Sequence, residues 1–458
     1  MVMRIENDAL GAVEIPDGVW WGPQTERSRH NFAVGPLMPL PVIRALIEIK
    51  RAAATVHGRD GSLPTTIADS IVQVASGLLT FNDHDLRAQF PLRVYQTGSG
   101  TQTNMNVNEV IAHQASQAAG TTVLANDHVN QGQSSNDTFP TAMHMAAYAA
   151  MGRLINVVQH TLSTLKTQEQ LYRHTVKLGR THLQDATPIT FGQEVSGWRA
   201  TLEQDVHTLT QARDQLRALP LGGTAVGTGL NTTTSTTKAI ISQLISDSGV
   251  AYTSMPNKFH GLSAHTELTN AHGAVKTLAT DLLKIANDIR FLASGPRGGY
   301  GELTIPANEP GSSIMPGKVN PTQAEALTMI ATRVMGNDVT ISVANSQGNF
   351  EMNVYKPVII AALLESVELL SGGLDQFNRL LLTGMTANAD HMRAAVDGSL
   401  MTVTALSPHI GYEVSARIAQ QALRDGTTLR AAALASGKVT AAQFDEWTNP
   451  LRMTRVDD

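Results

Sequence analysis

The stretch HTELTNAHGAVKTLATDLLKIANDIRFLAS, residues 265–294, decides the fold class. Its apolar residues recur at steps of three or four, which places them in one stripe along a helix: Leu268, Ala271, Val275, Leu278, Leu282, Ile285, Ile289 and Leu292. A stripe of this length is typical of a helix packed along other helices. Similar stripes occur over 360–381 and 198–219. We therefore predict a bundle of long helices.

The regions on either side of these stripes have a different character. Residues 1–133 contain repeated prolines between shorter helical segments, and short segments resume after about residue 384. We predict an all-α chain in three domains: a mainly helical N-terminal domain over 1–133, a long-helix bundle over 134–384 and a small helical C-terminal domain over 385–458. Apolar residues such as Ile359 and Leu364 lie beside the main stripe. These additional apolar faces favour packing against helices of another chain.

The composition limits the classes of partner. The chain has 458 residues, a net charge of -5 and no cysteine, so we expect neither a disulfide nor a thiol site. No basic stretch is interleaved with aromatic residues, which argues against nucleic acid. The opening residues lack an apolar signal core, and no uninterrupted apolar run reaches the length of a membrane span, so we expect a cytoplasmic protein. Charged residues make up only 16%, against about 25% in average domains, which indicates extensive burial or a bias toward Ala and Thr.

The loop GSSIMPGKVNP, residues 311–321, has glycines and a lysine but not the spacing of a nucleotide-binding loop. That loop requires a glycine, four residues, then Gly-Lys followed by Ser or Thr. Here five residues separate Gly311 from Gly317, and Val319 follows Lys318. No hydroxyl for a magnesium ion stands at that position. The loop therefore suits an anion other than a magnesium-bound nucleotide.

Three other polar segments carry candidate chemistry: TGSGTQTNMNVNEV at 97–110, GQSSNDTFPT at 132–141 and GRTHLQDATP at 179–188. In the second, Ser134 and Ser135 precede a predicted helix. Serines there act as an N-cap, and the free N–H groups of a helix start can also hold a carboxylate. Capping alone would explain the motif, so both interpretations stay open.

Two further kinds of site are not expected. Fifteen histidines are present, but no pair lies at helical spacing beside suitable carboxylates, so we expect no metal. We interpret His265 and His272, one heptad apart, as surface or packing residues. The run GGTAVGTGLN does not follow a strand with the spacing of a dinucleotide-binding loop.

Taken together, the polar segments and the 311–321 loop resemble the class II fumarate hydratases of the fumarase/aspartase superfamily. The likeness runs from GAVEIPDGVWWGPQTERS to SPHIGYEVSARIAQQAL, which is nearly the whole chain. It implies an all-α fold whose central helices form the core of a homotetramer. It also implies active sites shared between three subunits, no metal or organic cofactor, and a dicarboxylate substrate. The implied reaction is the reversible anti hydration of fumarate to L-malate, a step of the tricarboxylic acid cycle.

The resemblance also assigns residues. Removing a proton beside a carboxylate builds negative charge, so the site needs a base, an acid and hydrogen-bond donors. Ser312 is implied as the base, with its alkoxide stabilised by backbone N–H groups of the loop and by Lys318. His182, poised by Glu325, is implied on the water side of the reaction. Which of Ser312 and His182 moves which proton is left open. The implied substrate-binding residues are Ser99, Gly100, Thr101, Ser134, Ser135, Asn136, Thr181, Ser313, Lys318 and Asn320.

One segment departs from the family pattern. Fumarases of this class commonly have a His-Pro-Asn-Asp turn before the Ser-Ser-Asn segment, which forms a second anion site. Here Leu124 and Ala125 replace His-Pro, while Asn126 and Asp127 are retained. The sequence therefore makes a second anion site doubtful and predicts weak activation by dicarboxylates. A loop variation that the protein tolerates explains the change as well as altered regulation does.

Three other functions stay open at this point. Two are activities of the same superfamily, aspartate ammonia-lyase and mesaconate hydratase. The third is a non-catalytic structural homologue, against which the presence of Ser312, His182 and Glu325 argues.

Overall fold

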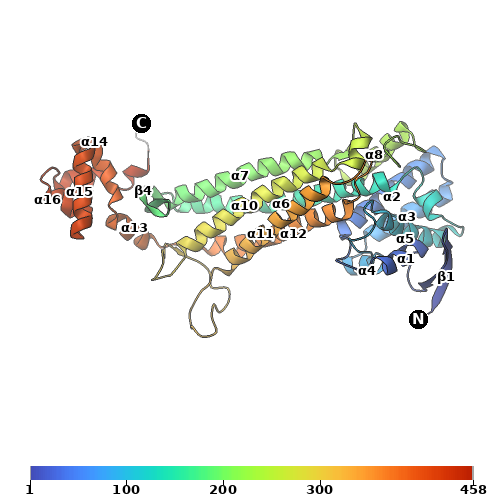
Figure 1. Cartoon of the computed structure of the whole chain (residues 1–458), viewed down its shortest axis with the longest axis horizontal. Coiled ribbons are helices and arrows are strands. Elements are labelled where there is room, and N and C mark those ends of the chain that lie inside the picture. The colour runs from blue at the N-terminus through green and yellow to red at the C-terminus, as the bar shows by residue number, and fades with distance from the viewer. Residues whose placement is uncertain (1, 456–458) are drawn as a thin grey trace. The chain divides into compact units, whose positions relative to one another are not determined.

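The computed structural model describes residues 2–455 and is mainly helical (Figure 1). The longest helices are α6 (Ser135–Leu171), α7 (Phe191–Gln215), α10 (Thr266–Leu292), α11 (Thr322–Asn345) and α12 (Lys356–Leu380). The all-α prediction and the two stripes at 265–294 and 360–381 are confirmed. The third stripe was extended too far. Helix α7 ends at Gln215, and Leu219 is buried from a short strand instead, β5 (Ala218–Leu219).

The chain divides into two compact units, and each unit takes parts of the same long helices. Unit 1 comprises the residues up to Ile155, His207–Thr277 and Thr332–Leu369. Unit 2 comprises Asn156–Val206, Leu278–Ala331 and the residues from Leu370 onward. Because this division cuts the long helices, it does not test the three predicted domains, whose boundaries stay a prediction.

Unit 1 combines the first part of the chain with long-helix segments. Its shorter helices are α1 (Pro23–Asn31), α2 (Leu40–Asp60), α3 (Thr65–Leu79), α4 (Asp83–Gln89), α5 (Thr101–Ala119), α8 (Thr234–Ser248) and α9 (Lys258–Ser263). Its strands form two small sheets, the antiparallel pair β1 (Met3–Asp8) and β2 (Gly11–Pro16) and the parallel pair β5 and β6 (Thr253–Ser254).

One group of polar residues between α10, α11 and α12 in unit 1 is paired. His272 on α10 contacts Asp338 on α11 through Nδ1 (3.0 Å) and Ser366 on α12 through Nε2 (2.9 Å). Asn337 also donates to Ser366, at 3.0 Å. His265 and His272 are both fully buried, which agrees with their interpretation as packing residues. A buried polar group that is hydrogen-bonded fixes the register of the helices without an unpaired donor.

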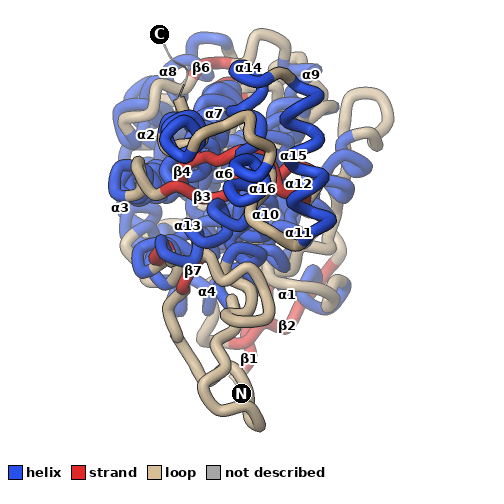
Figure 2. The backbone as a smooth tube through the Cα atoms, turned by 90° about the vertical axis from the view of Figure 1, so that its left-hand side faces the viewer, coloured by secondary structure: helices blue, strands red, loops and turns tan. Residues whose placement is uncertain are grey.

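Unit 2 contains the hairpin of β3 (Val176–Thr181) and β4 (Gln184–Thr190), which the sequence did not predict. A second antiparallel pair joins β7 (Leu303–Thr304) to β8 (Thr386–Ala387). The strands are short (Figure 2). The C-terminal helices are α13 (Ala389–Gly398), α14 (Ser407–Ile410), α15 (Tyr412–Asp425), α16 (Leu429–Ala435) and α17 (Ala441–Trp447). Several of them share an apolar core that includes Leu406, Ile418 and Phe444.

One helical stretch meets the length and composition of a membrane span. Residues Lys356–Gly384 have a mean hydropathy of 1.6 over their most apolar window, although Glu365 and Glu368 mean that the stretch is not an uninterrupted apolar run. However, 56% of that window is buried inside the structure. A core helix of a bundle meets the same criterion, so this stretch is weak support for a membrane partner.

Candidate active site

In unit 1, the starts of α5 and α6 bring together a chain of hydroxyl groups. The Ser99 and Thr101 hydroxyls lie 2.8 Å apart, and the Thr101 hydroxyl lies 2.7 Å from that of Ser135. Gly100 adopts φ 77° before α5, and a Cβ at that position would overlap the ring of Phe139. We call Ser99, Thr101, Ser134 and Ser135 the hydroxyl cradle. Its members come from two separate polar segments, 97–110 and 132–141. All four belong to the predicted substrate-binding set.

The start of α6 is capped and firmly anchored. The Ser134 hydroxyl accepts the N–H of Asn136 at 3.2 Å, so the capping interpretation is correct for this serine. Asn136 donates its side-chain amide to the carbonyl of Ala225 at 2.7 Å. Asp137 is fully buried and accepts the N–H groups of Ser134, Gly222 and Thr224. Burial raises the pKa of Asp137, and these backbone donors partly offset the effect. The glycine-rich run after residue 221 therefore holds the first turn of α6.

In unit 2, the β3–β4 hairpin presents Thr181 and His182. Thr181 pairs with Gln184, so the turn has two residues, His182 (φ 56°) and Leu183 (φ 61°). Turns with positive φ at both positions favour Asn-Gly, because side chains are strained there. Because His and Leu are strained in this turn, their side chains serve a purpose other than forming the turn. Among residues 2–455 the imidazole of His182 has no hydrogen-bond partner, and neither hydrogen bond nor ion pair joins it to Glu325.

The base of this hairpin is fixed by buried charges. Lys177 contacts Glu194 at 2.6 Å and Glu302 at 3.0 Å, and Arg180 contacts Glu302 at 2.6 Å. The side chains of Lys177 and Glu302 are only 2% and 1% exposed. Arg180 also lies over the ring of Tyr300. The hairpin is therefore held at its base while its tip is exposed.

The loop 311–321, which we call the serine loop, is mostly exposed. The Ser312 hydroxyl oxygen accepts the N–H groups of Ile314 (3.3 Å) and Met315 (3.2 Å). Asn320 donates its side-chain amide to the carbonyl of Gly311 at 2.6 Å and so closes the loop. Ser313 and Lys318 are exposed. Two N–H donors at one serine oxygen favour its deprotonated form, because hydrogen bonds to the charged state lower its energy.

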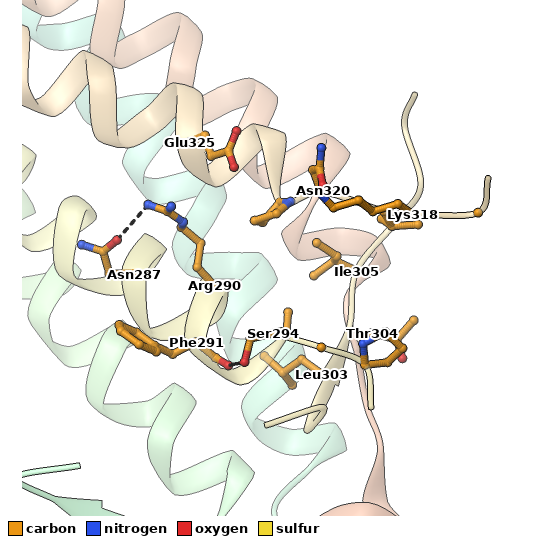
Figure 3. A pocket seen from close by; sticks show the side chains of 16 residues that line it. Asn287, Arg290, Phe291, Ser294, Leu303, Thr304, Ile305, Lys318, Asn320 and Glu325 are labelled. Carbon is orange, nitrogen blue, oxygen red and sulfur yellow. Dashed lines mark hydrogen bonds between the residues drawn. The ribbon is translucent and has the colours of Figure 1, made fainter. Parts of the chain in front are cut away.

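A cavity of about 720 Å³ lies beside the serine loop. Lys318, Asn320 and Glu325 line it together with Arg290 of α10, whose guanidinium donates to Asn287 at 3.2 Å (Figure 3). Ser312 is not among the lining residues. The cavity is large for a four-carbon diacid, since pockets of about 300–1,000 Å³ hold drug-sized ligands.

The site residues thus form three sets in one chain: the hydroxyl cradle with Gly100 and Asn136, the hairpin tip, and the serine loop with Glu325. Two cations escaped the sequence analysis. Arg290 lies in the last turn of α10, directly after Ile289 of the apolar stripe, and resembled an ordinary basic residue at a helix end. Lys50 lies at a buried position of the largely apolar helix α2. A lysine among apolar residues was the one sequence signal that could have identified it.

The segment that resembles a second anion site is one turn of π-helix, Ala125–Val129. The N–H of Leu124 donates to Nδ1 of His128 at 3.0 Å, while Asn126 and Asp127 are exposed. That this segment binds an anion weakly, if at all, stays a prediction. Elsewhere within residues 2–455, no three His, Asp or Glu side chains gather in a group able to hold a metal ion.

Comparisons with known proteins agree over the full chain. A family described as lyase matches residues 11–336, and one described as the fumarase C C-terminus matches residues 403–455. Class II fumarate hydratase of Listeria monocytogenes serotype 4b (strain F2365) is 52% identical over 456 residues, which are 99% of this chain and 100% of the relative. The enzyme of the same name from Bacillus subtilis (strain 168) is 49% identical over 462 residues, 99% of each chain. The crystal structure of a class II fumarase from Schistosoma mansoni superposes with a TM-score of 0.95 at 38% identity, covering 99% of both chains.

Proposed function

This chain belongs to the class II fumarate hydratase family and adds water reversibly to fumarate; we propose that its three sets of site residues meet in one active site built from several subunits. In the direction from L-malate, Ser312 as alkoxide takes the proton from the carbon next to one carboxylate. The hydroxyl group on the neighbouring carbon leaves as water after receiving a proton on the His182 side. The reverse direction adds water across the double bond in anti geometry.

The observation that carries this proposal is the environment of the Ser312 hydroxyl. Two backbone N–H groups point at its oxygen, and Lys318 follows in the same exposed loop. A serine of ordinary acidity is too weak a base for a carbon-bound proton, so its alkoxide needs such donors. An exposed serine loop with Lys318 on its surface also leaves room for a substrate carboxylate.

The other carboxylate is assigned to the hydroxyl cradle. The start of α6 carries partial positive charge, which favours an anion beside Ser134, Ser135 and Asn136. Thr101 and Ser99 add hydroxyls to the same place. Lys318, Asn320 and Ser313 would hold the carboxylate next to the proton that is removed, where negative charge develops.

The homotetramer is part of the proposal. The imidazole of His182 has no hydrogen-bond partner in the described part of the chain, and the cavity is larger than a four-carbon diacid. Both leave space for another chain. Helix α11 also exposes apolar side chains, Met329, Val339 and Val343. Exposed apolar side chains along a long helix favour association with further helices. We also keep the cytoplasmic location as a proposal.

A spectrophotometric assay tests the function. The absorbance of the conjugated diacid is followed while L-malate, L-aspartate and methylmalate are offered separately. We expect product from L-malate. Rapid product from L-aspartate alone would instead make the chain an ammonia-lyase, and absence of product from all three would favour the non-catalytic alternative. No observation in the structure favours either of these alternatives or a mesaconate hydratase.

A further inference from the structure

Unit 1 contains three lysines that are withdrawn from water without a carboxylate partner. Lys50 and Lys356 are fully buried, and Lys258 is half-buried. Within residues 2–455 no carboxylate oxygen lies within 4.0 Å of any of their Nζ atoms. Removing an ammonium group from water is costly unless an anion balances it. Three such lysines in one unit therefore call for an explanation.

Lys50 has the clearest link to the hydroxyl cradle. Its Nζ donates to Oδ1 of Asn130 at 2.8 Å and to Oε1 of Gln133 at 2.9 Å. Both acceptors are neutral amides, and Gln133 immediately precedes Ser134. Lys50 thus holds the segment that leads into the start of α6.

The same amides connect Lys50 to α5. Oδ1 of Asn130 also accepts the side-chain amides of Asn104 and Asn108, each at 3.2 Å. Asn104 in turn accepts the hydroxyl of Thr138 from the first turn of α6 at 3.1 Å. The charge of Lys50 therefore sits in a buried polar network that joins α2, α5 and the start of α6, beside the cradle.

The protein itself provides little compensating charge at this point. Among residues 2–455, Asp137 is the one carboxylate with an electrostatic effect on Lys50, and its oxygens are already occupied by three backbone N–H groups. Half-buried Glu48 on α2 lies near Arg51 and Arg44. The other charged or titratable groups on α2 and on the helices packed against it are exposed or bonded elsewhere: Arg44, Arg51, His57, Arg59, Asp60, Asp69, Glu109, His113, Lys238 and Asp247.

We infer that the anion that balances Lys50 is the dicarboxylate substrate, so that substrate binding is coupled to protonation of Lys50. This inference rests on the proposed function, because it concerns the same cradle. Lys50 does not touch the substrate in this account. It is a positioning residue that makes the cradle electrostatically favourable to a dianion only while it carries its proton.

The direction of the pH effect follows from the burial of Lys50. Burial lowers the pKa of Lys50 to about 7, so the free cradle is charged below that pH and neutral above it. A bound dianion favours the charged form and raises this pKa. Above about pH 7 the site must take up a proton to bind, and by linkage the dissociation constant rises by up to about tenfold per pH unit.

The experiment uses succinate, the saturated four-carbon dicarboxylate, as an unreactive probe. Its dissociation constant is measured by calorimetry between about pH 6 and pH 9, which spans the range in which Lys50 titrates. Three variants accompany the unaltered protein. Lys50→Met removes charge and donor, Lys50→Gln keeps a neutral donor, and Lys438→Met removes an exposed lysine far along the sequence as a matched control for net charge. Circular dichroism confirms that each variant is folded, and fumarate turnover is measured on the same preparations.

We expect the unaltered protein and Lys438→Met to bind succinate more weakly as pH rises, with proton uptake on binding near pH 8. Both Lys50 variants should bind at least about tenfold more weakly near pH 6 and lose most of that pH dependence. Full affinity in Lys50→Gln would mean that the hydrogen bond matters and the charge does not, which overturns the inference. An unchanged pH dependence in both Lys50 variants overturns it too. If the unaltered protein turns over fumarate in either case, the proposed function stands and only the role of Lys50 fails.

Discussion

The hydroxyl cradle and the serine loop present their polar groups in opposite ways. In the cradle, each hydroxyl of Ser99, Thr101 and Ser135 is already bonded to the next. In the serine loop, Ser313 and Lys318 face solvent, and the same is true of His182 at the hairpin tip. The contrast indicates that one chain prearranges the proposed binding groups of the cradle, while the serine loop and the hairpin tip stay open to partners that the chain alone does not supply.

The largest effect should come from the exposed side of this comparison. Ser312→Ala removes the proposed base, so we expect turnover to fall by about 10²–10⁴-fold. Because the side chain contributes little to packing, the unfolding midpoint and the oligomeric state should stay unchanged. Steady-state kinetics and sedimentation measure both. Turnover within tenfold of the unaltered enzyme would remove Ser312 from its role.

A substitution at the base of the hairpin should lower the free energy of unfolding. Glu302→Gln leaves Lys177 and Arg180 without their shared carboxylate in a buried place, and breaking such a pair costs about 3–5 kcal/mol. Denaturant unfolding measures the loss. The matched control is Glu203→Gln, which removes an exposed partner of Arg199 and should cost under about 0.5 kcal/mol. Equal losses in both variants would mean that the buried charges do not fix the hairpin.

A substitution in the hydroxyl cradle should have a smaller effect, on both stability and substrate binding. Thr101→Val keeps the volume but removes the hydroxyl between Ser99 and Ser135, which leaves their groups without a partner at a cost of about 1–3 kcal/mol. We expect KM to rise by about tenfold or more while kcat falls less, since the substitution acts on binding. A fall in kcat with KM unchanged would contradict a binding role for this cluster.

The smallest effect concerns the turn that carries His182. Leu183 at φ 61° bears a side chain in a conformation that costs about 1–2 kcal/mol, while glycine loses about 0.5–1 kcal/mol through its freedom in the unfolded chain. Leu183→Gly should therefore raise the free energy of unfolding by about 0.5 kcal/mol. A loss of stability would show that the Leu183 side chain has packing contacts that outweigh the strain.

The sequence predicted the helices better than the short elements. Stripes such as Leu268–Leu292 carry their own signal, because a period of three to four residues is set by the helix itself. The β3–β4 hairpin gave no such signal, since its turn is His-Leu instead of the Asn-Gly that marks a two-residue turn. The end of α7 at Gln215 was missed because Leu216 and Leu219 are buried on either side of the change from helix to strand.

The candidate site was predictable where a motif carried it and not where packing created it. The polar segments around Ser99, Ser134 and Ser312 stand out in sequence, whereas the contact of Thr101 with Ser135 depends on how α5 and α6 start beside each other. Lys50 was missed because a buried cation becomes notable only when its surroundings lack an anion, and Arg290 was missed because only the folded chain places it in the cavity. That property belongs to the folded chain and has no local sequence signal.

The central claim is that Ser312 and His182 of one active site come from different chains. The direct measurement is turnover after Ser312→Ala and His182→Ala chains, each inactive alone, are unfolded together and refolded as mixed oligomers. If the two residues reach a site from different chains, random mixing in a closed symmetric assembly should restore about a quarter of the activity. If both residues serve the same site from one chain, every site keeps one defect, and an inactive mixture would contradict the account.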